Sequence, residues 1–293
     1  MTHDTDTPRG KSFVMHSAAG YYDRLVWLVT SGRERALRAR FADLARLAPG
    51  ESVLDVGCGT GSLALEARRR VGPGGMVAAV DAAPEMIARA RRKAARTGLT
   101  VAFEAARAES LPFADGRFDV VLGTLMVHHL SRPVREQLAR EIRRVLRPGG
   151  RVLLVDFEPS AGGGGSFISR LHRHGHVPLR EIVALLRDVG LRVDDVGSVG
   201  FGDLRFALAR NEPASVAGAE PVHRALPPLP RPRWLVATAT AVVVGVHALV
   251  LHLAASWLAL AAVAAGVLVL LAIATHVNLA GGVHAILRRH ARR

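Results

Sequence analysis

Short apolar runs alternate with longer segments of helical periodicity between residues 52 and 210. The run SVLDVG, residues 52–57, is too short for a typical helix and is mostly apolar, which is typical of a strand buried on both faces. The segments between such runs repeat apolar residues at helical spacing. This alternation predicts an α/β fold with an open, mostly parallel sheet that helices cover on both faces.

The same pattern gives approximate bounds for each element. A helical stretch covers residues 17–47 and closes at Pro49 and Gly50, and Gly98 is expected to end a later helix. The expected strands are residues 52–57, 75–81, 100–105, 117–124, 151–157, 192–198 and 203–210, and the expected helices between them are residues 60–70, 84–96, 133–146 and 178–189.

The pattern also divides the chain into four regions. Residues 1–16 are polar and are expected to be disordered. Residues 17–210 form the expected α/β domain, which begins with a helical part at residues 17–48. Residues 211–233 contain six prolines and are expected to form an extended, semi-rigid linker. Residues 234–293 form the fourth region.

The fourth region contains two uncharged apolar segments, residues 234–253 and 257–279. Each is about 20 residues long, which is enough to cross a hydrocarbon core of roughly 30 Å. Only the sequence AAS separates them, so two spans would form an antiparallel helical hairpin with Trp234 and Trp257 at the membrane interface. The sequence therefore predicts a two-span transmembrane hairpin; the alternative is a buried helix pair inside a soluble protein.

Half of the basic excess of the chain lies beside these apolar segments. The net charge is +14, and residues 221–293 carry seven arginines but no lysine or acidic residue. Arginines before the first span and after the second place the preceding domain and both termini on the cytoplasmic side, by the positive-inside rule. A nucleic-acid-binding protein would gather this charge on a folded face. The expected partner is therefore the bilayer and not a nucleic acid.

The cysteine content and the N-terminus bear on the compartment. Cys58 is the single cysteine, which excludes an internal disulfide framework and makes a reducing compartment the default. The N-terminal sequence MTHDTDTPRGKSF has no apolar run of the kind that a secretory signal requires. We therefore expect the α/β domain to lie in the cytoplasm.

The sequence VLDVGCGTG, residues 53–61, carries the most informative chemical signal. A strand ends in this segment, and Gly57, Gly59 and Gly61 then form a tight turn into a helix. Glycine is needed there because the backbone takes unusual dihedral angles and a ligand approaches it closely. NAD-binding loops would require a glycine where this chain has Ser62, so the loop is not of that type.

Further motifs lie at the ends of the other expected strands. Asp81 ends the second strand, where a carboxylate can accept hydrogen bonds from both hydroxyls of a ribose. ARAESLPF follows the third strand, FDVVLGTLMVHHL contains the fourth strand, and VLRPGGRVLLVDF contains the fifth. Because ligands of such sheets bind beyond the carboxyl ends of the strands, these motifs are expected to line one site.

This ordered set of motifs resembles that of the class I S-adenosylmethionine-dependent methyltransferases, and residues 17–210 are similar to the ubiquinone and menaquinone methyltransferase branch. The resemblance implies a Rossmann-like sheet of seven strands, S-adenosyl-L-methionine as the cofactor, and a lid formed by the N-terminal helical part. It also implies that the glycine loop contacts the methionine portion of the cofactor and that Asp55 orients its amino group. Asp81 would hold the ribose, and Ala82 and Met86 would line the adenine pocket.

The adenine edge would lie near Ala108 and Glu109. The resemblance thus implies a set of cofactor-binding positions at the ends of the first four strands. These positions are Asp55, Gly57, Cys58, Gly59, Gly61, Asp81, Ala82, Met86, Ala108, Glu109 and Gly123.

One position departs from the pattern of the family. Many relatives have an aspartate that accepts a hydrogen bond from the adenine amino group where this chain has Arg107. A guanidinium cannot accept a hydrogen bond. Adenine recognition is therefore expected from backbone groups near Ala108 or from the Glu109 side chain.

Methyl transfer from a sulfonium requires alignment of the acceptor and, for a hydroxyl or an activated ring carbon, a base that removes a proton. His128 and His129 follow the expected fourth strand, and an ordinary histidine pKa of about 6.5 suits this catalytic role. The alternative is that they only pack or form hydrogen bonds in the loop. Tyr22, which lies beside Tyr21 and Asp23 in the expected lid, is a weaker candidate for contact with cofactor or substrate.

Two other groups of histidines are expected to be structural. The sequence HRHGH, residues 172–176, has no cysteine or acid nearby, so a solvated loop is favoured over a metal site. His247, His252 and His276 lie within the apolar segments or near their ends, where helix packing or an interfacial position is expected. No metal site is therefore expected.

The leading hypothesis is a membrane-tethered methyltransferase whose acceptor is a small, lipophilic molecule such as a quinone, a lipid or a polyketide-like compound. The motifs support the enzyme, and the expected hairpin supports a lipophilic acceptor. An alternative is a membrane-anchored, non-catalytic binding or regulatory protein with a degenerate methyltransferase fold, which Arg107 would fit. Nucleic-acid methylation has little support, since no NPPY-type motif follows the fourth strand.

Overall fold

The computed structural model describes residues 30–158, 177–212 and 220–230, together with Asp23, Val26, Trp27 and Leu268. The chain divides into two compact units, Met1–Pro230 and Arg231–Arg293, and only Leu268 is described in the second. Both predicted apolar spans, apart from Leu268, therefore lie outside the described residues, as do Tyr21, Tyr22, the HRHGH sequence, and the histidines of the apolar segments. In the described part of the chain, no helix is long and apolar enough to cross a membrane.

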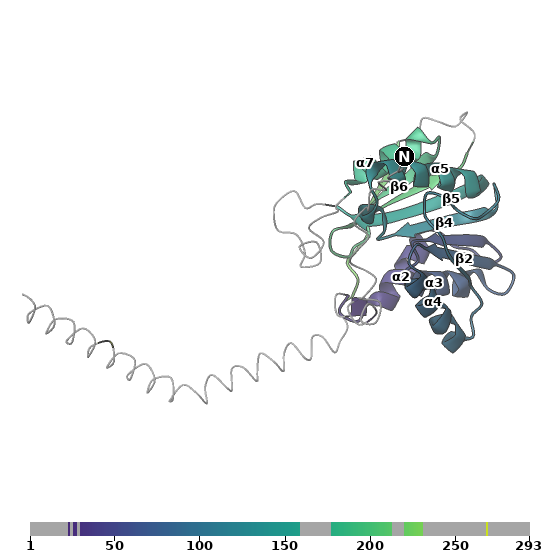
Figure 1. Ribbon diagram of the computed structural model, residues 1–293. Coiled ribbons are helices and arrows are strands. Elements are labelled where there is room, and N and C mark those ends of the chain that lie inside the picture. Colours follow the sequence, from purple (N-terminus) through teal and green to yellow (C-terminus); the bar gives the residue numbers. More distant parts are fainter. Residues whose placement is uncertain are drawn as a thin grey trace, which may run out of the picture. The chain divides into compact units, whose positions relative to one another are not determined.

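One sheet of eight strands organises the first unit, in the order β3-β2-β1-β4-β5-β7-β6-β8 (Figure 1). The strands and helices agree with the predicted bounds to within a few residues, apart from the start of β5, the presence of β8 and the helical stretch predicted at residues 17–47, where residues 30–33 are not helical and α2 begins at Glu34. The elements are α2 Glu34–Leu44, β1 Ser52–Val56, α3 Ser62–Val71, β2 Met76–Asp81, α4 Pro84–Thr97, β3 Ala102–Ala105, β4 Phe118–Thr124, the 3-10 helix η1 Val127–His129, α5 Arg132–Val145, β5 Leu146–Phe157, α7 Leu179–Asp188, β6 Arg192–Ser198, β7 Leu204–Arg210 and β8 Val222–Ala225.

The sheet is mostly parallel, as predicted. Strands β3, β2, β1, β4 and β5 pair in parallel, whereas β7 is antiparallel to both of its neighbours, β5 and β6. The order turns outward in both directions from β1 and β4, so the carboxyl ends of these two strands form the switch point of the sheet.

The prediction of seven strands was wrong, because β8 pairs in parallel with β6. This strand lies inside the predicted linker at residues 211–233. Its four residues, VHRA, are all exposed, so it has no buried face that an apolar pattern could reveal. A Cβ at Gly197 would lie 1.7 Å from the carbonyl oxygen of Arg224, so only glycine lets β8 approach β6 this closely.

Strand β5 begins earlier than the predicted residue 151. The helix α5 ends at Val145 and the strand begins at Leu146, so the sequence RPGG belongs to the strand. Two reciprocal hydrogen bonds hold this start: Gly149 donates its N–H to the Asn211 carbonyl, and Asn211 donates its N–H to the Gly150 carbonyl, both at 2.7 Å. These partners lie far apart in the sequence, which is why local composition did not predict the longer strand.

Helices cover both faces of the sheet, and each face has its own apolar core (Figure 1). Helices α2, α3 and α4 pack on one face, and α5 and α7 pack on the other. Successive residues of a strand point to opposite faces. Thus Val53 and Val120 lie in the first core, whereas Leu54 and Val121 lie in the second.

The chain after β8 also packs on the domain. The N–H of Leu229 donates to the Gly200 carbonyl at 3.1 Å, and its side chain is buried in the core under α2. From α2, Arg40 donates to the carbonyls of Val199 and Pro227, and Arg33, which precedes the helix, donates to that of Leu229. The described residues of the predicted linker therefore hold α2 in place.

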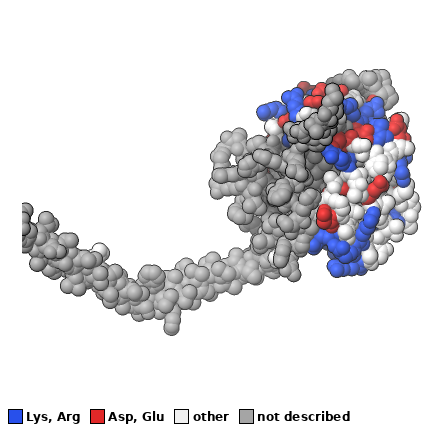
Figure 2. Space-filling model, viewed as in Figure 1, with Lys and Arg blue, Asp and Glu red and all other residues white. Residues whose placement is uncertain are grey.

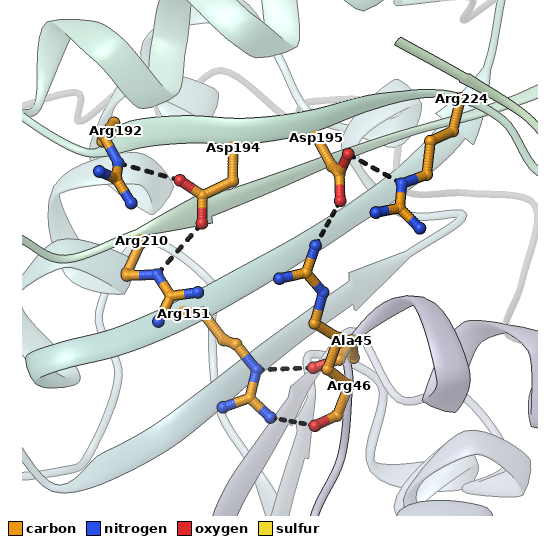
Figure 3. Close-up of polar contacts among 8 residues, drawn as sticks. All are labelled: Ala45, Arg46, Arg151, Arg192, Asp194, Asp195, Arg210 and Arg224. Carbon is orange, nitrogen blue, oxygen red and sulfur yellow. Dashed lines mark hydrogen bonds and ion pairs between the residues drawn. The ribbon is translucent and has the colours of Figure 1, made fainter. Parts of the chain in front are cut away.

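Ion pairs tie β8 and α2 to the centre of this region. The buried carboxylate of Asp195, on β6, accepts hydrogen bonds from Arg224 at 3.0 Å and from Arg46 at 2.5 Å (Figure 3). Arg151 donates to the carbonyls of Ala45 and Arg46 nearby (Figure 3). Each arginine thus has an acceptor at this edge of the molecule.

Charges of both signs occur on the surface. Figure 2 shows Lys and Arg side chains interspersed with Asp and Glu over the upper part of the visible face, and a group of Lys and Arg side chains at its lower end. Among the described residues, Arg and Asp also form pairs, such as Arg210 with Asp194 at 3.1 Å. The described surface in this view is therefore not one continuous positive face.

Candidate functional site

The glycine loop between β1 and α3 has the backbone that its sequence predicted. Gly57, Gly59 and Gly61 have positive φ angles of 69°, 54° and 78°, a region that side chains disfavour. A Cβ at Gly57 would lie 2.8 Å from Cβ of Met126, and one at Gly61 would lie 2.9 Å from Phe103. A Cβ at Gly59 would meet nothing within 4 Å. The loop is therefore packed tightly on one side and open at its middle glycine.

Asp81, at the end of β2, fastens this loop. Its Oδ2 accepts the N–H of Gly59 at 2.8 Å, and its Oδ1 accepts the N–H of Ala83 at 2.9 Å. Burial raises the pKa of Asp81, and the two backbone hydrogen bonds oppose that rise. A carboxylate offers about four lone-pair sites. Asp81 therefore has acceptor capacity left for a ligand beside the loop.

Asp55, near the end of β1, is 1% exposed, and its Oδ2 has no hydrogen-bond partner among the described residues. Burial raises its pKa to about 7; the charge of Arg38 and a backbone hydrogen bond from Ala64 oppose the rise, and the charge of Asp81 adds to it. A buried polar atom without a partner costs free energy and calls for an explanation. A ligand that donates to Asp55 would supply one.

A pocket at the carboxyl ends of β1 and β4 joins Asp55 to the glycine loop, and Asp81 is not part of its lining. It contains four of the predicted residues, but sequence reasoning missed the six others. Arg38 comes from α2, whose place over the site depends on long-range packing; Thr124 and Leu125 follow β4 in the motif FDVVLGTLMVHHL. The lining residues are Arg38, Asp55, Gly57, Cys58, Gly59, Thr60, Ser62, Leu63, Thr124 and Leu125.

Leu125 gives this edge of the pocket an unusual backbone. Its φ angle is 58°, which is uncommon for a residue with a side chain and is associated with functional sites. The N–H of Leu125 donates to the Val155 carbonyl at 2.8 Å, which holds the turn against β5. Met126 then packs on Gly57, so the exit of β4 and the glycine loop contact each other.

The other predicted cofactor-binding residues are spread around the pocket rather than in its lining. Met86 is 2% exposed within α4, and Ala108 lies in the core on the α5 side of the sheet. Ala82 is exposed directly after β2. Gly123 lies inside β4, where a Cβ would meet the Leu154 side chain at 2.8 Å, so its glycine is explained by strand packing.

Arg107 and Glu109 pair with each other at the predicted adenine edge. The Nε of Arg107 lies 2.5 Å from Oε1 of Glu109, and the Arg107 side chain is 77% exposed. The guanidinium therefore extends into solvent and occupies one oxygen of the Glu109 carboxylate. Adenine recognition by Glu109 or by backbone groups near Ala108 therefore stays a prediction.

The N-terminal segment reaches the glycine loop through Asp23. Its Oδ1 accepts hydrogen bonds from Thr60 at 2.7 Å and from Lys93 at 3.0 Å, and Lys93 also donates to Ser62 at 3.0 Å. Burial alone would raise the pKa of Asp23, but these hydrogen bonds and the charge of Lys93 lower it. Asp23 was predicted to lie in a lid over the site, and the structure places it in contact with the loop.

The two predicted catalytic histidines are neighbours with different surroundings. His128 is buried in η1, and its Nδ1 lies 2.6 Å from Oδ1 of Asp156 at the end of β5. Asp156 also accepts the backbone N–H groups of His128 and Phe157. His129 is exposed, with its ring centroid 3.9 Å from that of His128. Asp156 was missed because its only sequence signal was its place at a strand end.

Cys58 fits a structural role. Burial raises the pKa of its thiol, with smaller contributions from the charges of Asp55 and Asp81, so the reactive thiolate is disfavoured. Its N–H donates to the Val80 carbonyl at 2.9 Å and links the loop to β2. No group of three or more metal-ligating side chains occurs among the residues that the structure describes.

Comparison with known protein families agrees with this arrangement. A family model described as a methyltransferase domain matches residues 53–150. A demethylmenaquinone methyltransferase of Thermus thermophilus is 40% identical over 151 residues, which cover 52% of this chain and 67% of that protein. A ubiquinone/menaquinone biosynthesis C-methyltransferase of Bordetella avium is 35% identical over 144 residues, which cover 49% of this chain and 56% of that protein. The chain thus spans about half to two thirds of these curated relatives.

Solved structures share the fold at lower identity. A SAM dependent methyltransferase from Aquifex aeolicus is 23% identical with a TM-score of 0.54, covering 64% of this chain and 97% of that chain. The [4+2]-cyclase SpnF is 22% identical with a TM-score of 0.52, covering 61% of this chain and 80% of that chain. These likenesses concern the fold alone, and the cyclase illustrates that one fold can host different chemistries.

Proposed function

The chain belongs to the S-adenosylmethionine-dependent methyltransferases, whose cofactor is S-adenosylmethionine, and from this premise we propose that it methylates a quinone-type ring with the help of His128 as a base. The observation that carries the proposal is the buried contact between His128 and Asp156 at the carboxyl ends of β4 and β5. The acceptor class rests on the similarity to relatives that are named as demethylmenaquinone and ubiquinone/menaquinone methyltransferases.

The residues that line the pocket, with Asp81 behind the glycine loop, fit the cofactor. The glycine loop leaves its middle residue open, and Asp55 presents a buried oxygen that lacks a hydrogen-bond partner among the described residues. Asp81 has acceptor capacity beyond its two backbone hydrogen bonds and would hold the ribose hydroxyls. The bound cofactor supplies an electrophilic methyl group on a sulfonium. The chain supplies alignment and exclusion of water, which lower the barrier by several kcal/mol.

The contact with Asp156 fixes the role of each ring nitrogen of His128. An ionised carboxylate can only accept hydrogen bonds, so Nδ1 of a neutral His128 carries the proton and Nε2 is the basic nitrogen. Arg135, on α5, donates to the Val127 carbonyl at 3.1 Å and fastens η1 beside this pair. His128 would accept the proton of an acceptor hydroxyl, and Asp156 would hold its ring in the productive tautomer.

A ring hydroxyl of a reduced quinone gives this base a proton to remove. Loss of that proton raises the electron density of the ring, and the neighbouring unsubstituted carbon can then take the methyl group as the bond from methyl to sulfur breaks and S-adenosylhomocysteine leaves. The methylated ring carbon then loses its own proton, and the ring oxygen regains one, which restores the hydroquinone. Polyprenylated quinones are lipophilic, which fits the two apolar segments at residues 234–253 and 257–279. We therefore include in the proposal that this C-terminal region tethers the enzyme to the cytoplasmic side of a membrane.

The test is transfer of a labelled methyl group from S-adenosylmethionine to reduced demethylmenaquinone by the full-length protein. We expect His128→Gln and Asp156→Asn to lower kcat by about 10²–10⁴, whereas His129→Gln, at an exposed ring, changes it little. The loss in the Asp156 variant should appear in kcat more than in KM, and cofactor affinity measured by calorimetry should be unchanged. Full activity of His128→Gln, or cofactor binding without transfer to any reduced quinone, would contradict the proposal. Recovery of the protein in the soluble fraction after cell lysis would contradict the tether.

A further inference from the structure

The five residues that follow β8, residues 226–230, form a packed segment that we call the strap. The N–H of Leu229 donates to the Gly200 carbonyl, on the turn between β6 and β7, at 3.1 Å. The Leu229 side chain is buried in the same apolar core as Leu37 and Phe41 of α2. The strap is therefore joined to the domain by both its backbone and its one buried side chain.

Two arginines of the α2 region bind the backbone of the strap. Nη1 of Arg40 donates to the Pro227 carbonyl at 2.5 Å and to the Val199 carbonyl at 3.0 Å. Arg33, directly before the helix, donates to the Leu229 carbonyl at 3.3 Å. Hydrogen bonds from a charged donor are stronger than those between neutral groups. These contacts therefore hold α2 against the strap from its first residue to Arg40.

Gly200 permits the close approach of these elements. Its φ angle is 75°, a region that favours glycine. A Cβ at this position would lie 2.4 Å from the Pro227 carbonyl oxygen and 2.7 Å from Nη1 of Arg40, closer than real Cβ atoms come. The turn, the strap and α2 therefore meet at a place that only glycine allows.

The strap reaches the cofactor pocket through α2. Arg38 is the lining residue that comes from this helix, whereas the others come from the β1–α3 segment and the exit of β4. Arg38 lies between Arg33 and Arg40, the two residues that bind the strap. The far end of α2 is held separately, because Arg151 donates to the Ala45 carbonyl at 2.7 Å. Loss of the strap would therefore free the part of α2 that lines the pocket.

We propose that the docked strap positions α2 for cofactor binding, with Arg40 and Leu229 as positioning residues. Because linkage is reciprocal, the bound cofactor favours the docked strap by the same factor by which the docked strap favours the cofactor. The strap ends at Pro230, where the first compact unit ends, so an attachment of the chain beyond this residue acts on the pocket through the strap. This positioning requires only the cofactor, and neither the quinone nor His128 takes part in it.

Calorimetric titration with S-adenosylhomocysteine measures one side of this linkage. This ligand is the cofactor without its methyl group, so it fills the same pocket without reacting. In the full-length protein, we expect Arg40→Met to weaken its binding by about 5- to 50-fold. Replacement of residues 226–230 by glycine and serine should weaken it by a similar or larger factor. Arg35→Met, at an exposed position of α2, is the matched control and should bind like the wild type.

The two changes combined in one protein separate action through the strap from any other action of Arg40. Once the strap is replaced, Arg40→Met should change the affinity by less than about twofold, because the partner through which it acts is already lost. An equal loss of affinity in both backgrounds would overturn the proposal, since Arg40 would then affect the pocket without the strap.

Hydrogen exchange of the wild-type protein measures the other side of the linkage and requires no variant. Saturating S-adenosylhomocysteine should slow exchange at the Leu229 amide by about the factor that separates the dissociation constants of the strap-replaced and wild-type proteins. The Leu191 amide, which donates to the Leu186 carbonyl on the other face of the sheet, is the control and should slow less.

Unchanged exchange at Leu229, or equal slowing at Leu191, would overturn the proposal, because the strap would then stabilise the fold without sensing the cofactor. If the linkage has the expected size but the protein transfers no methyl group to a quinone, the positioning role is confirmed and the acceptor proposal fails.

Discussion

Asp55 and Asp195 are both buried carboxylates on parallel strands, yet their surroundings differ. Asp195 is 3% exposed and accepts hydrogen bonds from Arg46 and Arg224, which bring together the end of α2, β6 and β8. Asp55 is 1% exposed, and one of its oxygens has no partner in the described residues. Burial raises the pKa of Asp55 to about 7. Asp195, by contrast, has an arginine beside each of its two carboxylate oxygens.

The partners of the two carboxylates indicate that Asp195 stabilises the fold and that Asp55 binds a ligand. A carboxylate whose partners are all supplied by the chain stabilises the arrangement of the elements that carry them. A carboxylate left without a partner destabilises the ligand-free protein, and that cost is recovered only when a ligand donates to it. The two aspartates should therefore respond in opposite ways to the same substitution.

The largest expected effect concerns the segment that supplies Arg224. Shortening the chain after Glu212 removes β8, one partner of Asp195, and the buried Leu229. We expect the free energy of unfolding to fall by about 3 kcal/mol or more, from the lost core contacts and strand pairing. Thermal unfolding of the two fragments, ending at Glu212 and at Pro230, measures this. Equal melting temperatures would show that the segment does not stabilise the domain.

The next effect concerns Asp55→Asn. Cofactor affinity should fall on the order of 100-fold because the charged acceptor is lost, while the ligand-free protein at pH 8 should be as stable as the wild type or more so. Between about pH 4 and 7 the native Asp55 keeps a proton that the unfolded chain has released, so wild-type stability falls as pH rises through this window. Thermal unfolding from pH 5 to pH 8 should show a growing advantage of the variant. A constant difference across this range would contradict the assignment.

Asp195→Asn should have the opposite profile. The free energy of unfolding should fall by about 1–2 kcal/mol. The loss is smaller than for a fully buried ion pair, because the Arg46 and Arg224 side chains are 45% and 51% exposed and water can hydrate them. Cofactor affinity should change by less than about twofold, since the carboxylate lies outside the pocket. Denaturant unfolding and calorimetry of one preparation give both values. A loss of affinity similar to that of Asp55→Asn would remove the distinction between the two carboxylates.

The smallest effect concerns the contact of the N-terminal segment with the glycine loop. Lys93→Met removes hydrogen bonds to Asp23, Thr60 and Ser62, and the Lys93 side chain is itself 28% exposed. We expect cofactor affinity to fall by about two- to fivefold, since the loop keeps its backbone contacts. Arg92→Met, one position away and exposed, is the control for calorimetry. A loss as large as that in Asp55→Asn would mean that this cluster, and not Asp55, dominates binding.

Sequence reasoning predicted the parts of the fold that depend on local pattern. The apolar runs predicted seven of the eight strands, and the glycine spacing predicted the loop with its three positive φ angles. It did not predict β8, whose residues are all exposed, or the early start of β5, which depends on Asn211. Both misses depend on contacts between residues far apart in the chain.

The residues of the candidate site likewise include some that the local sequence predicts and others that depend on contacts between distant parts of the chain. Asp55, Asp81 and the loop glycines follow from motif and strand order, because the carboxyl ends of parallel strands meet. Arg38 and Asp156 could not be identified from the sequence. Arg38 is one of several arginines on an amphipathic helix, and only packing selects the one that reaches the pocket. Asp156 becomes meaningful only through its 2.6 Å contact with His128.

The most direct measurement is the number of protons released when S-adenosylmethionine binds at pH 6, obtained by calorimetry in buffers of different ionisation enthalpy. Because burial raises the pKa of Asp55 to about 7, most ligand-free molecules hold a proton there at this pH. The incoming ammonium must displace that proton. We predict release of roughly one proton for each cofactor bound by the wild type, and none by Asp55→Asn. Binding by the wild type without proton release would contradict the assignment of Asp55 as the unpaired carboxylate that receives the cofactor.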